Sequence, residues 1–180
     1  VEPEGDRIEL TEDFLPALKK IQPFIGNDAS RPWAMGVLLR GQSAFATNNI
    51  VIIELWLGYA FPTPLNIPAA TVKELIRIKE PPNAMQVTET SITFFYKGGR
   101  WMRSQLYTTE WPDLSGLLGT ACDYKLVPEG LFEAIETIAP FTDESDRVHF
   151  SPATVATTID PSQGASMDIV DIPSAGCFQA

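Results

Sequence analysis

A chain of 180 residues is long enough to bury a core and form one or two compact domains. Hydrophobic residues make up 44% and charged residues 20%, the balance of an ordinary globular protein. The formal net charge of −10 argues against indiscriminate nucleic-acid binding, because phosphates are neutralised by Lys and Arg. A few cations gathered on one surface could still bind them.

Residues that could support catalysis or metal binding are scarce. Cys122 and Cys177 are the only cysteines and His149 is the only histidine, which is too few for a zinc site with four ligands of these types. Motifs of nucleophilic hydrolases, phosphate-binding loops and dinucleotide sites are absent. The acidic run at 143–146 is typical of a solvated loop, and a hydrolase is a remote alternative. We therefore predict no enzyme activity, no cofactor and no metal site.

The first predicted unit is an extended lead-in followed by an amphipathic helix within residues 8–21. Thr11 suits the start of that helix, whereas Pro16 lies deep enough to kink or delay it. Three strands should follow, with turn signals at 40–41 and 47–49 between them. The apolar stripe of the helix is Leu15, Leu18 and Ile21, and the strands are expected at 34–39, 42–46 and 50–58.

The same pattern returns twice along the chain. Fifty-seven residues separate Leu10 from Ile67, and 60 separate Ile67 from Val127. Aligned in this way, apolar positions coincide in columns, and strands again follow each helix, so every copy reads β-α-β-β-β. The columns are Leu15, Val72, Phe132; Leu18, Leu75, Ile135; and Ile21, Ile78, Ile138. The later strands are expected at 86–87, 91–96 and 100–107, then at 147–150, 154–158 and 165–172.

The last residues match the opening of the second copy, since 171–177 aligns with 66–72. This predicts the start of a fourth helix, which roughly 45 to 55 further residues would complete as a module. We accordingly expect a complete two-module domain in residues 1–118. Residues 119–180 should form part of a second domain, with one module and the beginning of the next.

Several segments resemble the DNA sliding clamps. The helix 65–78, the strand 91–96 and the segments 103–106 and 110–113 follow one another as similar motifs do in bacterial DNA polymerase III beta clamps. Phe45-Ala46-Thr47-Asn48-Asn49 resembles the clamp turn Ala-Thr-Asp-Gly-His-Arg-Leu, with two Asn in place of Asp-Gly and without the His-Arg. This turn is not among the predicted DNA contacts.

The resemblance implies an α+β clamp fold, in which helices line one face and an antiparallel sheet forms the other. It implies a homo-oligomeric ring, with a trimer favoured over a dimer, that encircles duplex DNA and makes a replicative DNA polymerase processive. An ATP-driven clamp loader would open the ring. The expected location is cytoplasmic at the nucleoid, or the host cytoplasm for a phage protein. The alternative is a clamp-like interaction module of the replication machinery that does not encircle DNA.

The predicted DNA contacts lie on the outward faces of the first two helices. With 100° between successive residues, Lys20 and Arg77 fall opposite the apolar stripes. The full predicted set is Lys19, Lys20, Lys73, Arg77 and Lys79. A competing interpretation is that any amphipathic helix places Lys outward. The third helix weakens the DNA hypothesis, because Glu129, Glu133 and Glu136 occupy its outer face.

Partner proteins are expected to dock at the connector between the two domains, residues 113–123. Clamp partners insert short peptides into an apolar pocket near this segment, and Leu114, Leu117 and Leu118 are the apolar residues available there. Leu117 and Leu118 could instead simply cover the sheet, and the docking pocket could lie mostly in residues beyond this sequence.

Overall fold

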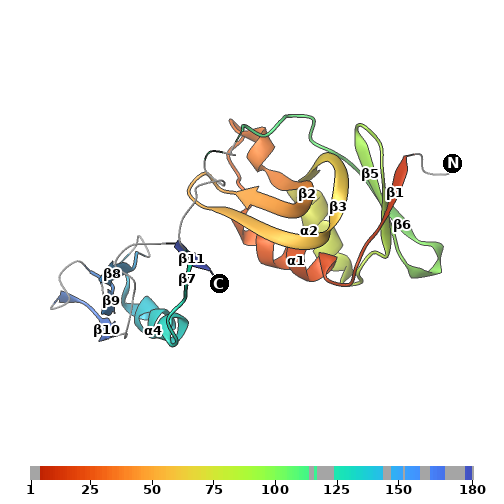
Figure 1. Cartoon of the computed structure of the whole chain (residues 1–180). Helices are drawn as coiled ribbons and strands as arrows, with labels where there is room; N and C mark the ends of the chain where they lie inside the picture. The colour runs from red at the N-terminus through yellow and green to blue at the C-terminus, as the bar shows by residue number, and fades with distance from the viewer. Residues whose placement is uncertain are drawn as a thin grey trace. The chain divides into compact units, whose positions relative to one another are not determined.

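The computed structural model describes residues 5–113, 116, 124–143, 147–151, 153–158, 163–168 and 177–179. The chain divides into two compact units, Val1–Pro112 and Asp113–Ala180, and each is considered by itself (Figure 1). The domain division expected at residue 118 stays a prediction.

The first unit contains two antiparallel sheets. One has four strands in the order β1-β4-β5-β6, and the other is the long hairpin β2-β3. The strands are β1 (Asp6–Glu9), β2 (Gly36–Thr47), β3 (Ile52–Pro68), β4 (Ala84–Val87), β5 (Ser91–Phe95) and β6 (Trp101–Gln105).

In each module of this unit, the strand that precedes the helix pairs with a strand of the other module. Strand β1 precedes the first helix but pairs with β4 of the second module, with Ile8 opposite Met85. The end of β3 precedes the second helix but pairs with β2 of the first module, with Leu65 opposite Leu39. Each module therefore supplies a strand that its partner needs, which makes the pair of modules a single folding unit.

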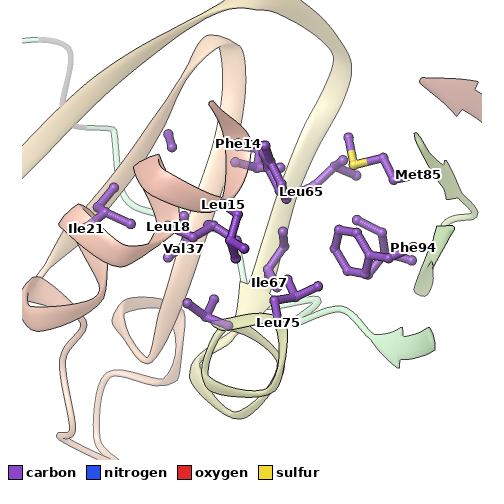
Figure 2. Packing of buried hydrophobic residues seen from close by; sticks show 14 of the residues in the cluster. Phe14, Leu15, Leu18, Ile21, Val37, Leu65, Ile67, Leu75, Met85 and Phe94 are labelled. Carbon is purple, nitrogen blue, oxygen red and sulfur yellow. The ribbon is translucent and has the colours of Figure 1, made fainter. Parts of the chain in front are cut away.

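Helices α1 (Phe14–Ile21) and α2 (Ala69–Ile78) pack on a shared core. Figure 2 shows side chains of α1 directed at residues of β2 and β3 and at Leu75 of α2. Helices of eight and ten residues are marginal alone, so this burial stabilises them, at roughly 1.5–3 kcal/mol for each large apolar side chain. The core residues from the helices are Phe14, Leu15, Leu18, Ile21, Val72 and Leu75.

The predicted delay of the first helix is confirmed. Helix α1 begins at Phe14, three residues after Thr11, so Pro16 falls in its first turn. Backbone N–H groups of the first turn have no intrahelical partner, and a proline there forfeits nothing. Short 3₁₀ turns flank the helices and strands at η1 (Gln22–Phe24), η2 (Pro32–Ala34) and η3 (Lys97–Gly99).

The predicted turn at Arg40-Gly41 is wrong. Strand β2 runs through it, and the register against β3 shifts on both sides of Gly41. Gly41 has a φ of +60°, a conformation that glycine adopts without strain, so the chain forms a bulge instead of reversing. The strand expected at 50–58 does not end there. It continues up to the start of the second helix as one strand, β3.

The second unit repeats the element order β-α-β-β-β. Its sheet has the antiparallel order β10-β9-β8, and helix α4 packs on it around Val155. The elements are β7 (Tyr124–Leu126), α4 (Leu131–Ile138), η4 (Ala139–Phe141), β8 (His149–Ser151), β9 (Thr154–Ala156), β10 (Ser166–Asp168) and β11 (Cys177–Gln179).

Two predictions for this unit are wrong. Phe132, placed in a core column, is 61% exposed, and the neighbouring Leu131 is buried in its stead, with Ala134 and Ile138. Residues 177–179, expected in a fourth helix, form strand β11 beside β7. Pairing with β7 gives the backbone of this segment hydrogen-bond partners along one edge.

Candidate nucleic-acid interface

Helices α1 and α2 contact one another and bury their apolar stripes in the same core. Their opposite faces are therefore exposed as neighbouring parts of one surface. We call the exposed Lys19, Lys20, Lys73 and Arg77 on these two helices the helix-face cations.

On α1, the cations lie in the last turn. Lys19 and Lys20 are both exposed, directly beside the buried Leu18 and Ile21. The carbonyl end of a helix carries partial negative charge, which favours lysines at that position. Among the described residues, no carboxylate forms an ion pair with either lysine.

On α2, Lys73 and Arg77 are four residues apart and share the outward face. Lys79 differs from them, because it caps the helix in a left-handed conformation with a φ of +61°. Its N–H donates to the carbonyl of Ile76, and its exposed side chain follows the helix instead of belonging to its face. Of the five predicted residues, four thus belong to the helix faces and Lys79 lies at their edge.

Sequence reasoning missed the partner of Arg77. The Nε of Arg77 donates to Oε2 of Glu74 at 2.8 Å, and its Nη2 lies 2.5 Å from Oε1. This hydrogen-bonded pair lowers the pKa of Glu74 and raises that of Arg77. The spacing of three residues between Glu and Arg on one helix was a readable signal.

Helix α4 provides no such surface. Its exposed residues include Phe132, Glu133, Glu136 and Thr137, and none of its residues is Lys or Arg. Glu133 and Glu136 are exposed on this helix as expected, whereas Glu129 lies in the turn before it and does not belong to its face.

The turn that resembles the clamp motif is stabilised from within. Oδ1 of Asn48 accepts the N–H groups of Ile50 and Val51, and the hydroxyl of Thr47 donates to the carbonyl of Val51. Asn49 adopts a φ of +71°, which Asn tolerates better than most residues. The acceptor of Asn48 is thus engaged inside the turn.

The predicted partner-docking leucines, Leu114, Leu117 and Leu118, lie outside the described residues. The segment before them lines a cleft of about 450 Å³ between β2, β3 and residues 107–111. Trp111 in its wall meets Trp33 edge to face, with ring centroids 5.2 Å apart. Other lining residues are Leu38, Arg40, Asn66, Tyr107 and Glu110.

Within the part of the chain that the structure describes, no three His, Cys, Asp or Glu residues are grouped so as to hold a metal ion. None of the described helices is long and apolar enough to cross a membrane. The single histidine, His149, lies in strand β8 and is half-buried.

The chain is similar to known proteins in its structure. No protein-family model and no curated protein sequence matches the chain. The sliding clamp of Bartonella birtlesii, DNA polymerase III subunit beta bound to griselimycin, is similar over 96% of this chain, with a TM-score of 0.70 and 16% identity. That of Pseudomonas aeruginosa gives 0.68 over 97%, with 15% identity.

The Helicobacter pylori beta clamp bound to a DNA ligase peptide is similar over the full length of this chain, with a TM-score of 0.65 and 15% identity. The chain spans about half of these clamps, namely 54%, 53% and 54% of their lengths. At such low identity the likeness establishes the architecture. The chain has the fold of the DNA sliding clamps.

Proposed function

We propose that this chain is part of a sliding clamp subunit, which encircles duplex DNA and holds a replicative DNA polymerase near the primer end. The observation that carries the proposal is the pairing of α1 and α2, whose exposed cations share one surface in a clamp fold.

Contacts of this kind suit a protein that must slide. Lys and Arg side chains bind phosphates without reading bases, so their contacts are weak, sensitive to salt and independent of sequence. The net charge of −10 keeps the overall attraction to DNA low. Retention then comes from closure of the ring, and tight binding would only impede movement.

A ring needs an interface between neighbouring subunits, and we assign this interface to β6. This strand pairs only with β5, so its other edge is open within the described sheet. Beside it, Trp101 is 60% exposed, and a cleft of about 320 Å³ is lined by Ile78, Tyr96 and Met102. An open edge with apolar residues invites pairing with another chain, and cyclic closure of a homo-oligomer would satisfy every such edge. The assembly would be a trimer or a dimer.

The proposed partners are duplex DNA, a DNA polymerase and an ATP-driven clamp loader. Docking of partner peptides is assigned to the connector with Leu114, Leu117 and Leu118, as predicted from the sequence. The chain itself is proposed to have no catalytic role.

The rival function is a clamp-shaped interaction module that acts without encircling DNA. Sedimentation equilibrium of the complete protein separates the two functions. The ring requires a closed dimer or trimer at micromolar concentration. A stable monomer at that concentration would contradict it and favour the rival.

A further inference from the structure

The helix-face cations are not equivalent, because among the residues that the structure describes only Arg77 is held by a carboxylate. The two side chains of this pair are 73% exposed for Arg77 and 42% exposed for Glu74, so both are accessible to solvent. Within the described part of the chain, Lys19, Lys20 and Lys73 have no corresponding ion pair.

The geometry of the pair determines what Arg77 can offer to DNA. A guanidinium binds a carboxylate or a phosphate best through two parallel N–H groups. Glu74 occupies one such edge, formed by Nε and Nη2. A phosphate can displace the carboxylate. Otherwise it must bind the remaining N–H groups while the carboxylate of Glu74 offsets the positive charge of the Arg77 guanidinium.

We propose that Glu74 attenuates the contact between Arg77 and DNA, so that α2 holds the duplex more loosely than its two cations alone would. This inference rests on the proposed function and names a residue that sets how strongly the clamp grips DNA. An exposed ion pair is weak, so the competition should change affinity by about two- to fivefold and should not abolish it.

The test is a double-mutant cycle with Glu74→Gln, Arg77→Gln and the two combined. Each complete protein is titrated against a fluorescently labelled linear duplex of mixed sequence over a series of salt concentrations. Glu74→Gln should tighten binding about two- to fivefold and steepen the dependence of log K on log salt by up to about 0.9, the value of one phosphate contact. In the Arg77→Gln background, the same change should have much less effect.

A matched control separates competition from total charge. Glu54→Gln removes the same charge from β3, where Glu54 is exposed and alternates with the core-packed Ile53 and Leu55. It should tighten binding less than Glu74→Gln does. Equal effects of the two variants, or an undiminished effect of Glu74→Gln in the Arg77→Gln background, would overturn the inference.

The outcome also distinguishes this inference from the proposed function. Wild-type binding that Arg77→Gln weakens but Glu74→Gln leaves unchanged would overturn only the attenuation by Glu74. If neither the wild type nor any variant bound duplex DNA even at low salt, the DNA-contact role of the helix faces would fail, and the inference with it. Circular dichroism of each variant checks that the helices remain folded.

Discussion

Tyr96 illustrates how burial shapes the chemistry of one residue. It is 6% exposed, and its hydroxyl has no hydrogen-bond partner among the described residues. Desolvation, with smaller contributions from Glu80 and Glu74, raises its pKa to about 12 from the ordinary value of 10.0. The neutral phenol is therefore favoured in the folded protein.

The pH dependence of stability follows from this shift. Between pH 10 and about 12, the unfolded chain loses the Tyr96 proton while the folded chain keeps it, so stability present below pH 10 falls as pH rises. We expect Tyr96→Phe to lose less stability than the wild type across this window, as measured by urea unfolding at several pH values. Parallel losses in the two proteins would contradict the assignment.

Leu131 and Phe132 test the revised core of the second unit. Leu131 is 5% exposed and Phe132 is 61% exposed. Leu131→Ala should therefore cost about 2–5 kcal/mol in the free energy of unfolding, and Phe132→Ala much less. Urea unfolding monitored by circular dichroism provides the comparison. A larger loss of stability for Phe132→Ala would show that Phe132 belongs to the core, as the sequence alignment predicted.

At the scale of elements, β2 and the end of β3 approach each other closely at Gly36. A Cβ on Gly36 would lie 2.4 Å from the carbonyl oxygen of Ile67 and 2.5 Å from Oδ1 of Asn66. The backbone of Ile67 is fixed by its pairing with Val37 and cannot easily yield. Gly36→Ala should thus destabilise the protein by about 1–3 kcal/mol, by analogy with overpacked cores.

Gly41 in the same strand is the matched control. It has open space around its Cα, and only its φ of +60° restricts the side chain. Because Asn tolerates that conformation, Gly41→Asn should cost under ~1 kcal/mol. Thermal unfolding of both variants measures the difference, and an equal loss would argue against the close contact at Gly36.

Much of the element order could be predicted from the sequence, because apolar residues at three-residue steps indicate a helix wherever they occur. The exchange of β1 and the end of β3 between modules could not. It depends on pairing between residues far apart in the chain, which local periodicity does not record. Leu131 and Phe132 are adjacent in the helix, so periodicity does not determine which of the two is buried. Packing in the cluster that contains Val155 buries Leu131.

For the candidate site, sequence spacing placed Lys20 and Arg77 on outward faces, and both are exposed. It could not show that α1 and α2 lie side by side, since that adjacency results from tertiary packing on one core. Lys79 was assigned with the helix residues, but a left-handed cap redirects the chain there. The spacing of three residues between Glu74 and Arg77 is enough to predict their ion pair, which the predicted DNA contacts did not take into account.

At the scale of the whole molecule, the helix-face cations should act together. Lys20→Glu combined with Arg77→Glu reverses two charges on one surface and should weaken duplex binding severely at moderate salt while leaving the fold intact. The slope of log K against log salt concentration should also become shallower, by about 0.9 for each phosphate that the variant no longer neutralises. Arg31→Glu with Arg40→Glu makes the same charge change at exposed cations outside the helices. Equal impairment by both pairs would refute the helix-face assignment.

Topological retention tests the central proposal most directly. The complete protein is allowed to thread onto linear duplex DNA, both DNA ends are blocked with bound streptavidin, and free protein is removed by gel filtration at high salt. An encircling ring should remain with the blocked DNA and leave it once a restriction enzyme opens a new end. Loss from the blocked DNA, or equal retention before and after cutting, would contradict encirclement.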